Sequence, residues 1–273
     1  MATLVVKAGG RALMANMDNI VASVASAARR GHRLVFVHGG GDLVTEYEKR
    51  LGIEPRFVTS PQGVRSRYTT REELEVFVMV LGGLLNKRIC SRLASLGARP
   101  VGLTGVDGLV LQAERRRRIV VLDPETGRKR VVEGGYTGRI TSVDTGFLEK
   151  LLDNGYTPVV APIAFDPREA TLLNVDGDQA AARIAAALHA DALIVLTDVD
   201  GLLLDGRLVE RLTVSEARRL LEEGRVGAGM NRKLYEIARA VEEGVARAVI
   251  TSASQPDPVQ RGLEGRGTVV EKG

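Results

Sequence analysis

Two glycine-rich stretches near the start of the chain have the composition of a phosphate-binding site. Lys7-Ala8-Gly9-Gly10 and His38-Gly39-Gly40-Gly41 each follow a short apolar run, and Asp42 comes next. Glycine lets backbone N–H groups approach an oxyanion closely, and a helix that begins there adds the positive end of its dipole. Lysine adds a compact point charge. These stretches therefore predict a site for an oxyanion or a transferring phosphoryl group.

A later stretch places two acids beside an asparagine. It reads Asn174-Val175-Asp176-Gly177-Asp178-Gln179-Ala180 and leads into an alanine-rich helical pattern. Asp176 can cap that helix, and Asp178 in its first turn would interact favourably with the helix dipole. Asp178 could instead hold nearby ammonium groups in place, and Asn174 could donate to a carboxylate. The residues alone leave both interpretations open.

A lysine at the start of another helix would complete such a group. Gly227-Ala228-Gly229-Met230-Asn231-Arg232-Lys233 places Lys233 one turn inside the helix, and the chain has only seven lysines beside 31 arginines. Lysine at positions 7 and 233 therefore indicates a need for a point charge, although an ordinary solvated lysine is the alternative for Lys233. No Gly-x-Gly-x-x-Gly or Gly-x-x-x-x-Gly-Lys-Thr motif occurs, so neither a dinucleotide fingerprint nor a P-loop is predicted.

Short apolar runs alternate with amphipathic segments along the whole chain. We expect buried strands at Leu4–Val6, Leu34–Val37, Pro100–Leu103, Pro158–Ile163, Ala192–Leu196 and Ala248–Ile250. We expect helices near residues 17–30, 42–51, 71–97, 144–154, 177–189, 214–224 and 230–243. The alternation predicts an α/β protein, an αβα sandwich with a mostly parallel central sheet, whose ligands bind beyond the carboxyl ends of the strands. A boundary near residue 190 would separate an N-terminal lobe, 1–190, from a C-terminal lobe, 191–273.

Residues 115–133 interrupt this alternation. Two β-prone halves flank Asp123-Pro124-Glu125-Thr126-Gly127, which predicts a hairpin with its turn at these residues. The segment carries seven basic residues, whereas the formal net charge of the whole chain is only +4. The hairpin is either a solvated arm or a docking surface for an acidic partner.

The remaining composition is that of an ordinary globular protein, with 44% hydrophobic and 26% charged residues. No apolar run reaches the roughly 20 residues of a membrane span, and a strand so near the N-terminus argues against a signal peptide. The single cysteine, Cys90, is expected to be a buried thiol in a reducing cytosol. We expect His38 to be a packing residue at its strand end. The many arginines and few asparagines and glutamines suggest a heat-adapted source.

Taken together, these stretches resemble the amino acid kinase family, specifically its acetylglutamate kinase branch. The matching stretches follow the family's order over nearly the whole chain: Lys7–Gly10, His38–Gly41, Gly63–Arg65, Asn174–Ala180, Leu196–Gly201 and Gly229–Lys233. The resemblance implies a carbamate-kinase-like fold and a kinase that transfers a phosphoryl group from ATP to a side-chain carboxylate. It implies Mg²⁺ carried by the nucleotide phosphates, without a dedicated metal site in the protein.

The resemblance also implies roles for individual residues. Lys7 and Lys233 would stabilise charge on the γ-phosphoryl group, and Asp178 would orient both lysines. Arg65 and Asn174 would hold the α-carboxylate of the amino acid. The backbone N–H groups that would contact the phosphoryl oxygens or the acceptor carboxylate are those of Gly9, Gly10, Gly40 and Gly41. The residues that would contact ATP are Thr197, Asp198, Gly201, Gly229 and Met230.

The loop at residues 62–70 departs from the acetylglutamate kinase pattern. Arg65 is shared, but Ser66-Arg67-Tyr68 resembles the branch whose acceptor is joined to a small acidic amino-group carrier protein. That branch implies carrier-linked L-2-aminoadipate, and also carrier-linked L-glutamate, as acceptors in lysine and arginine biosynthesis. Arg67, Tyr68 and Arg71 would contact the tethered tail. The body of the carrier would contact the basic hairpin, especially Arg115, Arg116, Arg117, Arg118 and Arg128 to Arg130.

Other functions are compatible with parts of the pattern. An N-acetyl-L-glutamate 5-kinase with an unusual loop would share the chemistry and differ only in the acceptor. A nucleic-acid-binding protein would use the basic hairpin, but the chain has 4% aromatic residues and no tryptophan to stack on bases. A catalytically inactive nucleotide sensor would not need Lys7, Asp178 and Lys233. We expect a cytoplasmic homodimer that binds neither nucleic acid nor membrane; a helix before the first strand, which links related dimers into hexamers, is absent from the sequence.

Overall fold

The fold is built on an eight-stranded sheet in a computed structural model that describes residues 1–61, 63 and 65–273, apart from the side chain of Ala228. Gln62 and Val64 of the predicted loop lie outside the described residues. The strand order is β16-β18-β17-β13-β1-β2-β10-β5. Their bounds are β1 (Thr3–Ala8), β2 (Arg33–His38), β5 (Pro100–Leu103), β10 (Thr157–Val160), β13 (Ala192–Thr197), β16 (Arg211–Thr213), β17 (Arg247–Ser252) and β18 (Thr268–Glu271). Neighbours pair in parallel except β17 with β18, which confirms the predicted mostly parallel sheet.

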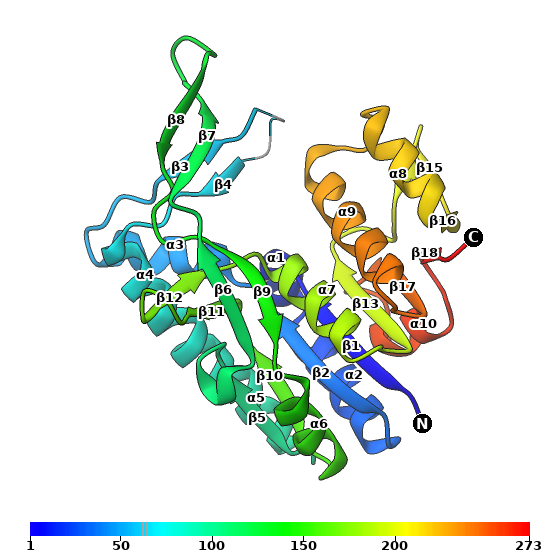
Figure 1. The fold of residues 1–273 in the computed structure, drawn as a ribbon. Helices are drawn as coiled ribbons and strands as arrows, with labels where there is room; N and C mark the ends of the chain where they lie inside the picture. The colour runs from blue at the N-terminus through cyan, green and yellow to red at the C-terminus, as the bar shows by residue number, and fades with distance from the viewer. Residues whose placement is uncertain (62, 64) are drawn as a thin grey trace.

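Helices cover both faces of this sheet (Figure 1). Alternate residues of β1 point to opposite faces, so Val5 belongs to one buried cluster while Leu4 and Val6 belong to the other. The helices on the Val5 side are α6 (Thr145–Asp153), α7 (Gly177–Ala187), α8 (Val214–Glu222) and α9 (Ala228–Glu242). Those on the other side include α1 (Gly10–Ala15), α2 (Met17–Arg29), α3 (Gly41–Arg50), α4 (Arg71–Phe77), η1 (Val78–Leu85), α5 (Asn86–Ser95) and α10 (Pro258–Leu263).

All seven predicted helices are present, and the segment expected as one helix near 71–97 runs without interruption through α4, η1 and α5. Its middle part, η1, is a π-helix, a wider winding that often occurs at functional sites. The helices α1 and α10 and the strands β16 and β18 were not predicted. The expected strand Pro158–Ile163 was wrong in extent: β10 ends at Val160, and Ile163 starts another strand. Pro162 has no N–H group for a strand ladder, which favours a break there.

Smaller sheets stand beside the main one. A four-stranded sheet has the order β12-β11-β6-β9 and contains β6 (Leu111–Arg115), β9 (Gly138–Val143), β11 (Ile163–Asp166) and β12 (Thr171–Asn174). A short 3₁₀ turn, η2 (Asp107–Leu109), precedes β6, and β14 (Leu203–Leu204) pairs with β15 (Arg207–Leu208). Two hairpins project from the body next to each other in Figure 1: β3 (Phe57–Thr59) with β4 (Arg65–Arg67), and β7 (Arg118–Leu122) with β8 (Lys129–Glu133).

We call the β7–β8 hairpin, residues 118–133, the arm. It confirms the predicted hairpin and its turn, where Asp123 accepts hydrogen bonds from the backbone N–H groups of Glu125 and Thr126. The predicted start at residue 115 was wrong, because Arg115 ends β6 and its backbone N–H donates to Asp166. Within the described residues, no helix is long and apolar enough to cross a membrane.

Candidate active site

Three neighbouring strands bring the predicted glycine and lysine stretches to one edge of the main sheet. β13, β1 and β2 lie side by side in parallel, with Ala8 opposite Leu196 and His38. The stretches that begin at Lys7, His38 and Thr197 therefore emerge together at the carboxyl ends of these strands, where ligands of such sheets bind.

The two glycine stretches lie against each other so closely that side chains would not fit. A Cβ atom on Gly10 would lie 2.8 Å from the backbone nitrogen of Gly40. Gly40 has φ +156°, and a Cβ atom there would lie 2.6 Å from a methyl carbon of both Leu81 and Leu85 on η1. Glycine at these two positions is thus required by the backbone and by its close neighbours.

Asp178 lies between the two lysines. Its Oδ1 is 2.6 Å from Nζ of Lys7, and its Oδ2 is 3.3 Å from Nζ of Lys233. Burial is the largest influence on the carboxyl group and opposes its ionisation, but the charges and hydrogen bonds of Lys7 and Lys233 outweigh it and lower the pKa of Asp178. Asp178 is therefore ionised at neutral pH and holds two ammonium groups at the edge of the sheet. Asp176 caps α7 as predicted, accepting from the backbone N–H of Gln179 at 2.9 Å.

Two cavities meet at these residues. The larger has a volume of about 920 Å³ and the smaller about 220 Å³, and both are lined by Lys7, Gly10, Gly41 and Asp42. The smaller one is also lined by Gly9, Arg11, Thr197, Asp198 and Lys233. The hydroxyl group of Thr197 donates to Asp198 at 3.0 Å and thereby lowers the pKa of that carboxyl group. Two ligands bound in these cavities would face each other across Lys7 and the glycines.

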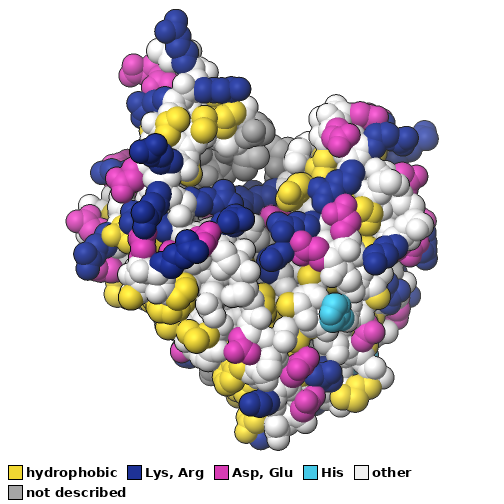
Figure 2. All heavy atoms as spheres, viewed as in Figure 1, with side chains coloured by type: hydrophobic (Ala, Val, Ile, Leu, Met, Phe, Trp, Pro, Cys, Tyr) yellow, Lys and Arg dark blue, Asp and Glu magenta, His cyan; other side chains and the backbone are white. Residues whose placement is uncertain are grey.

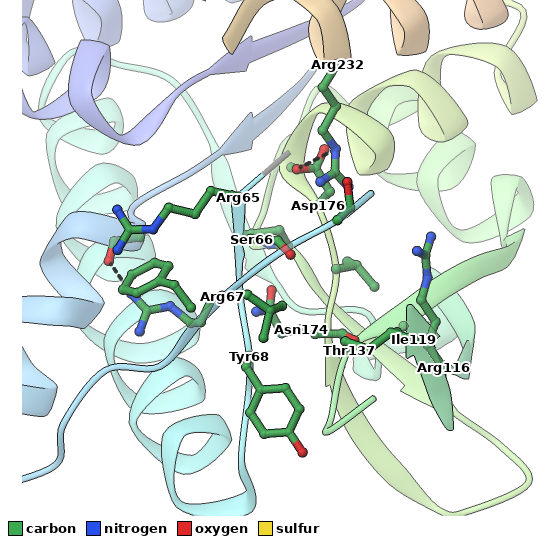
Figure 3. A pocket seen from close by; sticks show the side chains of 18 of the residues that line it. Arg65, Ser66, Arg67, Tyr68, Arg116, Ile119, Thr137, Asn174, Asp176 and Arg232 are labelled. Carbon is green, nitrogen blue, oxygen red and sulfur yellow. Dashed lines mark hydrogen bonds and ion pairs between the residues drawn. The ribbon is translucent and has the colours of Figure 1, made fainter. Parts of the chain in front are cut away.

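The larger cavity contains both residues predicted to hold an α-carboxylate (Figure 3). The guanidinium carbon of Arg65 lies 4.2 Å from the ring centre of Phe57, and its N–H groups find no acceptor among the described residues. The side-chain amide of Asn174 donates to the hydroxyl group of Thr69 at 2.9 Å, which leaves its second N–H available. In the view of Figure 3, Asn174 and Thr137 lie between Arg65 and Arg116.

Arg67 and Tyr68 differ from each other in their surroundings. The Arg67 side chain is 8% exposed and forms an ion pair with Glu48, which is completely buried. It also donates to the hydroxyl group of Thr45 at 2.5 Å, so it lies against α3 at the wall of the larger cavity. Tyr68 lines the larger cavity, and its hydroxyl group makes no hydrogen bond in the part of the chain that the structure describes.

The four arginines of the predicted docking surface divide into two pairs. Arg115 and Arg117 both form ion pairs with Glu169, at 3.2 and 2.9 Å. Arg116 and Arg118 line the larger cavity, and neither forms an ion pair with a described residue. Burial lowers the pKa of Arg116, as do the charges of Arg232 and Arg139. Figure 2 shows Lys and Arg side chains gathered along the hollow between the arm and the α8–α9 region. A cavity wall with unpaired cations is suited to an anionic ligand.

The structure places the remaining predicted nucleotide contacts outside both cavities. Gly201 is enclosed, because a Cβ atom there would lie 2.5 Å from Oγ1 of Thr268, and Met230 packs against the core. Gly229 has open space around it. Sequence reasoning missed Arg232, which lines the larger cavity and pairs with Asp176 at 3.3 Å. Arg232 could have been predicted from the sequence, because it lies inside the stretch Gly229–Lys233 that resembles the kinase family and precedes Lys233 directly.

These features together define a phosphotransferase of a known family. The model of the amino acid kinase family matches residues 2–252, so the chain belongs to that family and is a kinase. Full-length similarity is found to proteins named [LysW]-aminoadipate/[LysW]-glutamate kinase. The identity is 48% with that of Sulfolobus acidocaldarius, over 98% of this chain and 100% of the relative, and 50% with that of Saccharolobus solfataricus, over 99% and 100%.

Solved structures share the fold. N-acetylglutamate synthase from Neisseria gonorrhoeae, in complex with coenzyme A and N-acetyl-glutamate, has a TM-score of 0.81 and 26% identity; the match covers 100% of this chain and 60% of the synthase. Carbamate kinase from Giardia lamblia bound to AMP-PNP has a TM-score of 0.69 over 100% of this chain and 99% of that enzyme, at 18% identity, a likeness of fold alone. The predicted αβα fold with a mostly parallel sheet is thus confirmed.

Proposed function

We propose that this kinase phosphorylates the side-chain carboxylate of L-2-aminoadipate, and of L-glutamate, while the amino acid is joined to an acidic carrier protein. The observation that carries the proposal is the pair of cavities that meet at Lys7, with volumes of about 220 Å³ and about 920 Å³. The wall of the larger one includes Arg116 and Arg118, which form no ion pair with a described residue. The larger volume suits an acceptor with a tether, and its charge suits an acidic one. The full-length relatives named for LysW-linked substrates support the same choice.

The reaction requires alignment and charge stabilisation more than covalent help from the protein. The acceptor carboxylate in the larger cavity would attack the γ-phosphorus of ATP, whose phosphates would lie in the smaller cavity. A bond forms from a carboxylate oxygen to phosphorus, the bond from phosphorus to the β–γ bridging oxygen breaks, and ADP leaves with the electron pair. The nucleophile is already an anion, so no general base is needed.

In this account, Lys7 and Lys233 balance the charge of the transferring group, and Asp178 keeps their ammonium groups in place. The N–H groups of Gly9, Gly10, Gly40 and Gly41 would donate to the phosphoryl oxygens and the acceptor carboxylate. Arg65 and Asn174 would hold the α-carboxylate. Thr197 and Asp198 would border the nucleotide, together with Gly201, Gly229 and Met230 only if the C-terminal lobe closes on it. We place the ATP-binding lobe at 191–273 and the acceptor-binding and dimerisation lobe at 1–190.

Mg²⁺ would be held mainly by the phosphates of ATP. The described residues include no group of three or more His, Cys, Asp or Glu side chains placed to bind a metal ion. Asp42 and Asp198 are the two carboxylates that line the smaller cavity, where we place the phosphates. This set fits Mg²⁺, which keeps several water ligands and binds through few carboxylates. The ion would shield the negative charge of the phosphates during attack.

For the carrier, we propose contacts with Tyr68, Arg116 and Arg118 at the cavity wall. Arg115 and Arg117 pair with Glu169, and Arg67 pairs with Glu48, so these three contribute to the shape of the surface more than to direct contact. We further propose a homodimer in the cytoplasm of a heat-adapted organism, with no role in nucleic-acid or membrane binding.

Trapping the product as a hydroxamate tests the chemistry. Wild-type protein, ATP and Mg²⁺ are incubated with carrier-linked 2-aminoadipate, carrier-linked glutamate or N-acetylglutamate, and hydroxylamine captures any acyl phosphate. The proposal predicts a hydroxamate on both carrier-linked acceptors. A hydroxamate on N-acetylglutamate alone would identify the alternative, an N-acetyl-L-glutamate 5-kinase. Binding of ATP without any hydroxamate would identify a nucleotide sensor.

A further inference from the structure

The loop at Gly39–Asp42 presents three backbone N–H groups that donate no hydrogen bond to any described residue. They belong to Gly40, Gly41 and Asp42, and these residues line the cavity in which we place the acceptor. In a trans peptide unit, the C=O of one residue and the N–H of the next point in opposite directions. Whatever holds the carbonyl groups of Gly39, Gly40 and Gly41 therefore decides where the three N–H groups point.

Each of the three carbonyl groups accepts hydrogen bonds from its own set of donors. The ring Nδ1 of His38 is 3.1 Å from the Gly39 oxygen and must be the donor, because a carbonyl group only accepts. The Gly40 oxygen accepts from the backbone N–H of Val44 at 3.1 Å, inside α3. The Gly41 oxygen accepts from two side chains, the hydroxyl group of Thr45 and the guanidinium group of Arg67, each at 3.1 Å. The resulting concave set of N–H groups is the kind of backbone nest that binds anions.

His38, Val44 and Thr45 are close to the loop in sequence, whereas Arg67 lies in the β3–β4 hairpin that lines the larger cavity. It belongs to β4, next in sequence to Tyr68, and two residues after Arg65. Along α3 it contacts Gly41, Thr45 and Glu48, which are spaced i, i+4 and i+7 and therefore lie on one face of the helix. The Arg67–Glu48 pair is buried, with side-chain exposures of 8% and 0%, so this contact is well shielded from water.

We infer that Arg67 is a positioning residue that couples the acceptor-binding hairpin to the phosphoryl-binding loop. When β4 lies against α3, the guanidinium group of Arg67 donates both to the Gly41 carbonyl and to the Thr45 hydroxyl that shares this carbonyl. It thereby helps to hold the peptide between Gly41 and Asp42 with the N–H toward the cavity. An acceptor that binds Arg65 and Tyr68 stabilises β4 in this place and so completes the nest. The inference rests on the proposed function of this cavity, but assigns Arg67 to the turnover step and not to carrier binding.

The test compares kcat with KM in Arg67→Met, using the acceptor that wild-type protein phosphorylates best. Positioning predicts that kcat falls by roughly 10- to 100-fold, because a misplaced donor is lost from the transition state, while KM for the acceptor changes less than about threefold. Arg67→Lys should recover part of kcat. Direct contact with the carrier predicts the opposite pattern, a raised KM with unchanged kcat, and that result would overturn the inference.

A double variant separates positioning from folding. Arg67→Met alone leaves Glu48 buried without its partner, whereas Arg67→Met/Glu48→Leu replaces the buried pair by apolar side chains, a change that proteins often tolerate. If Arg67 served stability alone, the double variant would regain both its thermal midpoint and its kcat. Positioning predicts that the midpoint recovers and kcat stays low. Should wild-type protein accept only N-acetylglutamate, the proposed substrate would be wrong, yet the same comparison on that acceptor would still decide the role of Arg67.

Discussion

The ammonium group of Lys7 lies 2.6 Å from a carboxylate oxygen of Asp178, and neither side chain is more than 9% exposed. Because Asp178 also reaches Lys233 at 3.3 Å, one buried acid holds two cations at the junction of two cavities. The three groups together carry one net positive charge. A transferring phosphoryl group gains from that charge, and the fixed geometry means that little reorganisation is needed during the reaction.

Replacing the acid should therefore affect turnover more than nucleotide binding. Asp178→Asn keeps the shape but removes the charge that holds the two lysines, so kcat should fall by roughly 100-fold. Asp144→Asn is the matched control, since Asp144 caps the distant helix α6 and accepts from the N–H of Phe147. Steady-state kinetics with saturating ATP and acceptor would measure both. A kcat for Asp178→Asn within threefold of that of the control would contradict the role of Asp178.

Replacing Lys7 tests the contribution of one of the two cations that Asp178 holds. Lys7→Ala should lower turnover about a hundredfold at saturating substrates, as expected for the loss of one preorganised donor worth ~3 kcal/mol. Lys49→Ala provides the comparison, because Lys49 is exposed in the last turn of α3. Hydroxamate formation per minute is the measurement. Near wild-type turnover in Lys7→Ala would show that this lysine does not act on the phosphoryl group.

His38 should make stability depend on pH. The imidazole ring is completely buried, and this burial is the main reason why the pKa of His38 is lowered from 6.5 to about 4. The charge of Lys87 lowers the pKa further, whereas the hydrogen bond to Gly39 raises it. Below pH 6.5 the unfolded chain binds a proton that the folded protein does not, so stability is full above that pH and is lost as pH falls toward 4. The loss attributable to His38 between pH 7.5 and 5 should be about 2 kcal/mol.

His38→Asn isolates this contribution, because asparagine can still donate to the Gly39 carbonyl group but does not titrate. Urea unfolding at both pH values would give the free energy of unfolding for each protein. We expect the wild type to lose about 2 kcal/mol more than the variant. Equal losses in the two proteins would mean that the pKa of His38 is not lower in the folded protein than in the unfolded chain.

Two adjacent arginines provide a matched test of the carrier surface. Arg116 lines the larger cavity without an ion pair among described residues, whereas Arg117 pairs with Glu169 at 2.9 Å and does not line it. Arg116→Gln should raise KM for a carrier-linked acceptor about 10-fold or more, as for the loss of a charge-assisted hydrogen bond, and should reduce the dependence of KM on salt. Arg117→Gln should change KM less than threefold. Equal effects of the two substitutions would indicate non-specific attraction.

The strands that could be predicted from the sequence are those with a clear local pattern of apolar residues. β1, β2 and β13 are short apolar runs followed by glycine or threonine, and their parallel pairing explains why Lys7, Gly40 and Thr197 meet. The short strands β16, at the edge of the sheet, and β18, beside it, have too few residues for a clear period. They form through pairing, since β18 pairs with both β16 and β17.

The contacts of Arg67 show a different limit. Its partners Glu48 and Gly41 are 19 and 26 residues away in sequence, and only the placement of β4 on α3 brings them together. The type of residue predicted an anionic partner, and within this chain the fold supplies one, the buried carboxylate of Glu48. The enclosure of Gly201 could not be predicted from the sequence either, because Thr268, which encloses it, is distant in sequence and is brought next to it only by the fold.

Acceptor preference can be measured as the ratio of kcat/KM for carrier-linked 2-aminoadipate to that for N-acetylglutamate, with wild-type protein at one ionic strength. We predict a ratio of about 100 or more, because Arg116 and Arg118 in the wall of the larger cavity would contribute ~3 kcal/mol or more to the binding of a tethered acidic acceptor. A ratio of one or less would show that the cavity does not recognise the tether. The enzyme would then be a kinase of free N-acylated amino acids.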